Sequence, residues 1–261
     1  MRTRTLAHLS DLHLGRSPET ARAAVRLRDL VEDAFDHVVV SGDVTHRGRR
    51  EELARFEELF GAMQRAGRLS VVPGNHDRLG EDVGARLMRG GRVEAHTHDG
   101  LYLVRVDSTG PHNKFLLAGH GQICADVIDE IELALAGAPR RHLTVLTLHH
   151  HPLPLPEETF GEFVSATLGW PNAAELRLGA RLLERIGGRC DLVLHGHRHV
   201  PSAMACDAGG RRPLAVYNAG SSTTLGRFRV FTHLDGALCG PPVWLDTQDV
   251  PALELAGTGT E

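Results

Sequence analysis

Side chains that can bind metal ions or move protons follow five short apolar runs of this chain. These polar groups are Asp11-Leu12-His13, Gly42-Asp43, Asn75-His76-Asp77, His149-His150-His151-Pro152 and His197-Arg198-His199. Histidine is the commonest protein ligand of metal ions and titrates near neutral pH, and the chain contains 17 histidines. Because scattered surface histidines would not collect behind apolar runs, the pattern indicates one shared site.

The number and type of these side chains indicate two metal ions. Asp-x-His places two side chains on the same side of an extended segment, so both can reach one ion. Seven oxygen and nitrogen ligands suit a pair of first-row ions that share one carboxylate. The seven are Asp11, His13, Asp43, Asn75, one of the three histidines 149–151, His197 and His199.

The apolar runs have the length of buried strands, and helical patterns separate them. Strands are expected at 5–10, 37–41 and 69–72, with amphipathic helices at 19–33 and 50–66. This βαβαβ order implies parallel strands, whose carboxyl ends meet at one edge of a sheet. The five polar groups are therefore expected to converge on one crevice.

The rest of the chain first repeats this alternation of strands and helices and then continues with short strands that no helices separate. Further strands are expected at 101–106, 143–148 and 191–194, and further helices at 81–89, 123–136 and 173–187. Short alternating segments near 202–206, 213–217 and 227–234 predict an antiparallel completion of a second sheet. The proline-rich stretch 152–172 is interpreted as a loop over the site.

Length and composition indicate a globular protein. We expect 261 residues in a single domain, with a core at 5–235 and a tail at about 250–261. A formal charge of −4 gives no overall basic field for nucleic acid. Four cysteines form no CxxC pair and are interpreted as reduced thiols. With no signal-peptide pattern and no apolar run of membrane length, a cytoplasmic protein without a membrane partner is expected.

Taken together, the ordered motifs resemble those of the calcineurin-like metallophosphoesterases. The motifs that carry the resemblance are Asp11-Leu12-His13, Gly42-Asp43, Gly74-Asn75-His76-Asp77, His150-His151-Pro152 and Gly196-His197-Arg198-His199, with the turn Tyr217-Asn218-Ala219-Gly220-Ser221. The resemblance covers about residues 5 to 222. It implies an α/β fold, a four-layer αββα sandwich of two mixed sheets flanked by helices, and a site for two ions of manganese, iron or zinc.

The resemblance also implies a role for each ligand. Asp11, His13, Asp43 and His199 would hold one ion, and Asp43, Asn75, His150 and His197 the other. The family pattern His-x-Pro selects His150 among its neighbours, because Pro152 lies two residues beyond it. His76 would lie beside the phosphate, and Asp77 would orient its imidazole. Substrate contacts are expected from Arg16, Arg78 and Arg198.

The implied reaction is hydrolysis of a phosphate ester by in-line attack of a metal-bound hydroxide. The segments Leu6 to His13 and His150 to Leu155 are most similar to bacterial cyclic-nucleotide and glycerophosphodiester phosphodiesterases. A small phosphodiester is therefore the expected substrate, and residues 152–172 or the C-terminal strands could form the surface of a homodimer.

Other functions remain open at this point. A DNA exonuclease or endonuclease of the repair type shares Ser-Asp-Leu-His-Leu-Gly, although the net acidity of this chain disfavours it. A lipid-precursor pyrophosphatase or a phosphomonoesterase would use the same ligands. A non-enzymatic interaction scaffold is disfavoured because every ligand position is filled.

Overall fold

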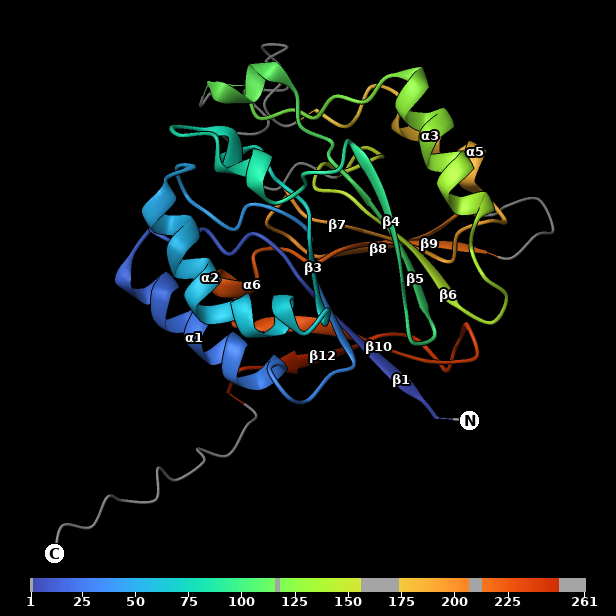
Figure 1. Ribbon diagram of the computed structural model, residues 1–261, viewed down its shortest axis with the longest axis horizontal. Coiled ribbons are helices and arrows are strands. Elements are labelled where there is room, and N and C mark those ends of the chain that lie inside the picture. The colour runs from blue at the N-terminus through green and yellow to red at the C-terminus, as the bar shows by residue number, and fades with distance from the viewer. Residues whose placement is uncertain (1, 116–117, 156–173, 207–212, 249–261) are drawn as a thin grey trace, which may run out of the picture.

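Two mixed β-sheets pack face to face between two layers of helices (Figure 1). The computed structural model describes residues 2–115, 118–155, 174–206 and 213–248. The predicted α/β sandwich is confirmed by this arrangement. The expected C-terminal tail and most of the stretch 152–172 lie outside the described residues.

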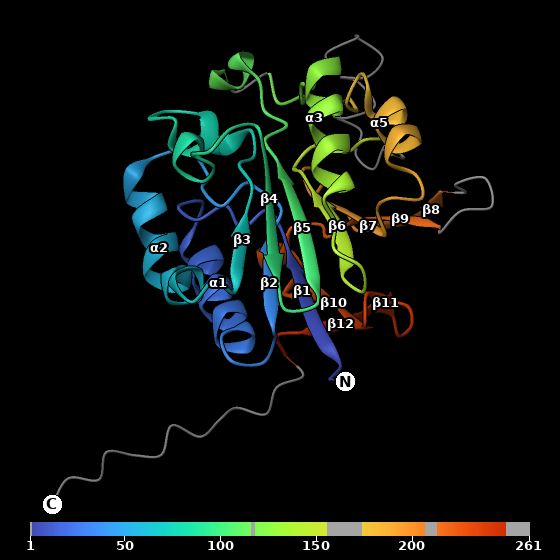
Figure 2. The same cartoon turned by 45° about the vertical axis from the view of Figure 1, so that its right-hand side comes forward.

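The first sheet is built around three parallel strands. Its strands are β1 (Arg4–Leu9), β2 (His37–Val40), β3 (Leu69–Val71), β10 (Arg227–Leu234), β11 (Ala237–Leu238) and β12 (Val243–Asp246). Strands β1, β2 and β3 run parallel, β10 lies antiparallel beside β1, and β11 and β12 pair with β10. Helices α1 (Pro18–Val31) and α2 (Arg50–Arg65) cover the outer face of this sheet (Figure 2).

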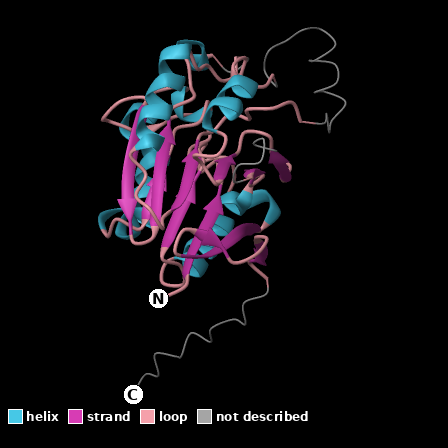
Figure 3. Cartoon of the chain, turned by 90° about the vertical axis from the view of Figure 1, so that its right-hand side faces the viewer, coloured by secondary structure: helices cyan, strands magenta, loops and turns pink. Residues whose placement is uncertain are grey.

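The second sheet has four parallel strands between two antiparallel edges. In spatial order its strands are β4 (Val93–His98), β5 (Leu101–Val106), β6 (Leu143–Thr147), β7 (Leu192–His195), β9 (Leu214–Asn218) and β8 (Ser202–Cys206). Helices α3 (Ala125–Ala136) and α5 (Gly179–Ile186) pack on its outer face, and Figure 3 shows the strands of the sandwich beside their helices. In the described part of the chain, short helices in the loops are η1 (His76–Arg78), η2 (Val83–Arg86), η3 (Pro111–Lys114) and α6 (Ser222–Leu225).

Helix α1 illustrates how the sequence determines these elements. Ser17 caps the helix by accepting a hydrogen bond from the Thr20 amide, and Pro18 occupies the first turn, where no amide donor is needed. The buried face carries Ala24, Leu27 and their apolar neighbours at helical spacing. This face packs against the first sheet, so burial of the apolar stripe holds the helix in place.

Three apolar layers confirm the four-layer order. One lies between the first sheet and its helices and another between the second sheet and its helices. The third lies between the sheets and contains Leu6, Val39, Leu103, Val145 and Phe231 among others. Both sheets therefore have two buried faces, which explains why their central strands are continuous apolar runs.

Two features of the topology differ from the sequence prediction. The segment 227–234 joins the first sheet, where Phe231 pairs with Leu6, rather than completing the second sheet. Phe228 and Phe231 face different apolar layers, so the apolar pattern of the segment does not specify its neighbour. Strand β4 was missed because Val93–His98 carries polar and largely exposed side chains.

Within the described residues, no helix combines the length and the apolarity that crossing a membrane requires.

Candidate metal centre

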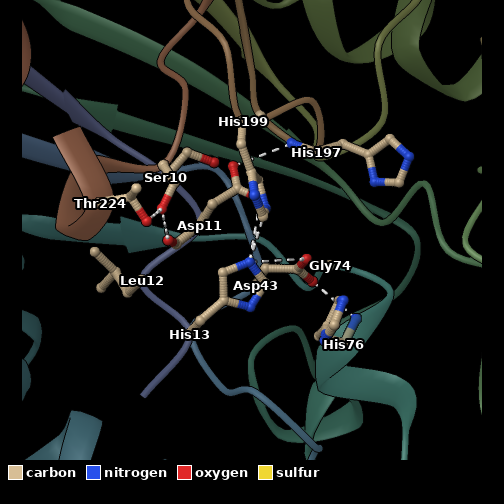
Figure 4. Close-up of polar contacts among 12 residues, drawn as sticks. Ser10, Asp11, Leu12, His13, Asp43, Gly74, His76, His197, His199 and Thr224 are labelled. Carbon is tan, nitrogen blue, oxygen red and sulfur yellow. Dashed lines mark hydrogen bonds and ion pairs between the residues drawn. The ribbon is translucent and has the colours of Figure 1, made fainter. Parts of the chain in front are cut away.

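The predicted polar groups meet where β1, β2, β3, β6 and β7 end, at the same edge of both sheets. Hydrogen bonds between the first two loops continue the pairing of β1 with β2 beyond the strands, as from the Leu14 amide to the Val44 carbonyl at 3.0 Å. Figure 4 shows Asp11, His13, Asp43 and His199 directed toward one another. The fold therefore holds these side chains on backbone that is fixed by sheet pairing.

The backbone at this site is strained. Asp11, His13, Asp43 and His197 have φ angles of 53°, 47°, 50° and 71°. Residues with side chains seldom adopt this left-handed region, and such strain collects at functional sites, where the surrounding structure holds it in place. The left-handed turns bring these four side chains to the common edge.

Two glycines allow the loops to approach closely. A Cβ atom on Gly74 would lie 2.1 Å from Oδ1 of Asp43, and one on Gly42 would lie 2.4 Å from Nδ1 of His149. Both distances are far below van der Waals contact, so no larger residue fits without moving the side chain of Asp43 or of His149.

One group of potential ligands surrounds Asp11. Nε2 of His199 lies 3.5 Å from Oδ1 of Asp11, and Nε2 of His13 lies 3.8 Å from the same oxygen. The two imidazole nitrogens are 2.9 Å apart. Asp43 closes the group, with Oδ2 at 3.9 Å from Nε2 of His13.

A second group lies on the other side of Asp43. Nε2 of His149 is 3.3 Å from the same oxygen, Oδ2 of Asp43, and 3.1 Å from Oδ1 of Asn75. Nδ1 of His197 lies 3.0 Å from that asparagine oxygen. Asp43 therefore stands between the two groups, as a carboxylate shared by two ions would.

The charges of the centre fit metal ions. Oδ1 of Asp11 is buried and has no hydrogen-bond partner among the described residues. Burial alone would raise the pKa of Asp11, but the imidazole of His199, whose Nε2 lies 3.5 Å from Oδ1, and the charge of His149 outweigh it and lower the pKa to about 2. Burial opposes ionisation of Asp43 too, yet the charges of His149 and His76 hold its pKa well below its usual range. Two buried carboxylates that stay ionised require a compensating positive charge.

Two imidazoles of the centre have the charge state that a metal ligand needs. Burial lowers the pKa of His13 and of His197 to about 3. Both rings are therefore neutral near pH 7 and present a lone pair, which metal binding requires. Oxygen and imidazole donors together suit first-row transition metals.

His149, rather than the predicted His150, lies beside Asp43 and Asn75. Its Nδ1 lies 2.7 Å from the carbonyl oxygen of Ser41, which can only accept, so Nδ1 donates and Nε2 faces Asp43. Burial would lower the pKa of His149, but the charge of Asp43 and its hydrogen bond raise it to about 9. The negative charge of Asp43 therefore favours a positive charge at this position, and a metal ion would supply it.

His150 is held by other groups. Nε2 of His150 donates to the carbonyl of Gly119 at 2.9 Å, and Nδ1 accepts from Oγ of Ser108 at 2.9 Å. Both ring nitrogens are thus engaged, although the ring lies close enough to His149 and His197 to form one cluster with them. The contacts do not support His150 as a ligand, and we propose His149 in its place. The His-x-Pro pattern failed as a guide because β6 ends at Thr147, and the loop beyond it decides which of the three rings faces Asp43.

His76 lies beside the centre, with its ring centroid 4.7 Å from that of His13, but Asp77 does not orient its imidazole. Nδ1 of His76 donates to the carbonyl oxygen of His46 at 2.7 Å. The buried carboxylate of Asp77 accepts instead from the amides of Gly74 and Thr45, at 2.9 Å each, and from the Thr45 hydroxyl at 2.6 Å. Asp77 therefore joins the loop that carries Asn75 and His76 to the loop after Asp43.

The three predicted substrate arginines differ in their surroundings. Arg78 binds Oγ1 of Thr109 at 2.8 Å and forms ion pairs with Asp82 and Asp107, so its guanidinium is held by protein groups rather than presented to a substrate. Arg198 is buried. Arg16 is exposed, and its role as a substrate contact stays a prediction.

The sequence prediction also missed His46. Its ring packs near-parallel to that of His76, with centroids 5.6 Å apart, and edge-on to that of His13 at 5.9 Å. The available signal was its position three residues after Asp43 in the same loop. A lone histidine in a loop carries no pattern that would have selected it.

The fold and these ligand groups are those of an α/β metal-binding protein. The family model of the calcineurin-like phosphoesterases matches residues 4–201, which is most of the chain. The protein belongs to the calcineurin-like phosphoesterase family, as its motifs predicted.

Comparison with individual proteins agrees with this assignment. A protein of Pseudoalteromonas sp. (strain SM9913), named probable cyclic nucleotide phosphodiesterase, is 26% identical over 207 residues, which cover 74% of this chain and 70% of the relative. Among solved structures, the purple acid phosphatase PPD1 from yellow lupin (Lupinus luteus) seeds has a TM-score of 0.65 at 12% identity, over 95% of this chain and 52% of the lupin chain. This chain thus spans about half the length of the lupin enzyme.

A dimetal phosphatase from Danio rerio is similar over nearly its whole length. Its TM-score is 0.59 at 10% identity, and the match covers 94% of this chain and 99% of the fish protein. At these identities the two solved structures support the fold alone.

Proposed function

We propose that this protein is a metal-dependent phosphodiesterase that hydrolyses a small diester of the cyclic-nucleotide or glycerophosphodiester type. The observation that carries the proposal is the position of Asp43 between two groups of oxygen and nitrogen ligands. Family membership implies a phosphoester hydrolase. The preference for a diester is supported by the name of the bacterial relative.

The proposed ligand groups assign a part of the reaction to each side chain. Two bound ions of manganese, iron or zinc would polarise the phosphoryl oxygens and acidify water. Asp43 would fix the spacing of the two groups, and Asn75 would contribute a neutral oxygen that limits the negative charge of the centre. The exposed side of the centre is formed by His199, whose side chain is 44% exposed, so a phosphate ester would enter there.

His76 is the proposed group that acts on the substrate beside the ions. Because its Nδ1 donates to the His46 carbonyl, only Nε2 remains to meet a phosphoryl or leaving oxygen. A proton held at this nitrogen would stabilise the negative charge that develops as the ester bond breaks. Its half-buried ring lies 4.7 Å from that of His13, measured between centroids, which places it at the edge of the first ligand group.

Metal analysis combined with a substrate panel tests the proposal. Purified protein should contain about two transition-metal ions per chain and should hydrolyse bis-p-nitrophenyl phosphate faster than p-nitrophenyl phosphate. Cyclic AMP, 2′,3′-cyclic nucleotides, glycerophosphodiesters and single-stranded DNA complete the panel, and sedimentation of the same sample tests the predicted homodimer. Failure to hydrolyse any phosphate ester after addition of Mn²⁺ would refute the proposed function.

His76→Ala separates catalysis from metal binding. The variant should keep its metal content, because His76 is in neither ligand group, and should lose roughly 10²–10⁴-fold in turnover, as expected for a general acid. Loss of an ion in this variant would show that His76 is a ligand instead.

A further inference from the structure

Hydrogen bonds fix the backbone of His46. Its amide donates to the Leu14 carbonyl at 2.9 Å, and its carbonyl accepts from Nδ1 of His76 at 2.7 Å. The loop is thus held from two sides. Nδ1 of the His46 ring is buried and has no partner among the described residues, and the residue as a whole is half-buried.

The ring of His46 shares a small space with two other imidazoles. One ring nitrogen from each of His13, His46 and His76 lies within 4.8 Å of the other two. His13 is a proposed metal ligand. His76 is the residue proposed to donate a proton to the leaving oxygen, and it is called the leaving-group residue below. A substrate oxygen that contacts the rings of His13 and His76 would therefore lie near His46 as well.

The ring of His46 can offer a hydrogen bond to an oxygen in this space. An imidazole carries at least one N–H donor in either charge state. Because the buried Nδ1 has no partner among the described residues, the ring is not committed to another protein group through that nitrogen.

We propose that His46 is a second leaving-group residue of the active site, which donates a hydrogen bond to the ester oxygen that departs beside His76. This inference rests on the proposed function. In the reaction, water adds to phosphorus, the bond from phosphorus to the ester oxygen breaks, and the departing oxygen receives a proton to become the alcohol. His46 shares the negative charge of this oxygen through a hydrogen bond, while His76 remains the proton donor.

The role predicts a dependence on the leaving group. A p-nitrophenolate departs readily without help, whereas a phenolate is more basic and accumulates more charge on the departing oxygen. Removing a donor should therefore slow the phenyl ester more. The two symmetrical diesters, diphenyl phosphate and bis-p-nitrophenyl phosphate, make this comparison without ambiguity about which group leaves.

The experiment compares His46→Leu and His46→Asn with the wild-type protein loaded with Mn²⁺. For His46→Leu, kcat/KM for diphenyl phosphate should fall roughly 10–100-fold, the range expected for one hydrogen bond to a charged group. The fall for bis-p-nitrophenyl phosphate should be clearly smaller. His46→Asn, which retains an N–H donor, should recover part of the loss. His96→Leu, at an exposed histidine on β4, is the control and should leave both rates unchanged.

Metal content and melting temperature of each variant separate this role from a structural one. Equal losses on both esters, no loss on either, or a loss accompanied by a missing ion would overturn the inference, because a group that only supports His13 would affect both esters alike. If the wild-type protein hydrolyses neither ester nor any other ester of the panel, the proposed function itself fails. Activity in the wild type with no selective effect of His46→Leu refutes the present inference alone.

Discussion

Replacing His149 by alanine is the sharpest test of the candidate metal centre. In the structure, Nε2 of His149 lies 3.3 Å from the shared oxygen of Asp43 and 3.1 Å from Oδ1 of Asn75. Removal of the ring takes one nitrogen from the second ligand group and leaves the first group intact. The variant should therefore lose one ion and keep the other.

The size of the loss can be bounded from the contacts. Removing even an outer partner of a metal ligand costs 10–100-fold in metal affinity. Loss of a direct ligand should cost at least about 100-fold, or about 2.7 kcal/mol. After dialysis against metal-free buffer, mass spectrometry of metals should find about one ion per chain in His149→Ala and about two in the wild type.

His150→Ala is the matched control, because it removes a neighbouring buried imidazole from the same loop. The hydrogen bonds of His150 run to Ser108 and Gly119, and losing them with the buried ring should cost about 3 kcal/mol of unfolding free energy. A loss of that size lowers the melting temperature by roughly 6–12 °C, while both ions remain. The reverse outcome, with one ion lost from His150→Ala and two retained by His149→Ala, would refute the reasoning and restore the ligand that the sequence predicted.

Three further predictions follow from contacts that the sequence did not reveal. Asp77→Ala should unfold at a lower temperature, because it leaves several buried donors unpaired at about 1–3 kcal/mol each. An unchanged melting temperature with lost turnover would instead favour the role predicted from the sequence, in which Asp77 orients the imidazole of His76. Arg78→Met should lower thermal stability and leave KM for the diester unchanged, since the guanidinium is held by two carboxylates; a large rise in KM alone would contradict this. The exposed Cys124 and Cys239 should react with a thiol reagent at pH 8 in the native protein. Burial raises the pKa of Cys190 to about 12, so it carries almost no thiolate and should react only after unfolding, and fast native reaction there would contradict the burial.

Much of the fold was predictable because its central strands are buried on both faces. Apolar runs such as Val38 to Val40 identified the parallel strands, and the helical patterns between them gave the crossovers. The edge strand Val93–His98 was not predictable in this way, since an exposed edge needs no apolar side chains. The sheet to which residues 227–234 belong was not predictable either, because pairing with β1 is a long-range contact that leaves no local pattern.

The three consecutive histidines show where sequence patterns stop determining a site. Period-two alternation holds only while the backbone is extended, and the strand before them ends at Thr147. Beyond that residue, the position of each ring depends on which neighbour each nitrogen meets. The Ser41 carbonyl orients His149 toward Asp43, whereas Nε2 of His150 donates to the Gly119 carbonyl. Both contacts cross from one element to another, so neither could be read from the order His-His-His-Pro.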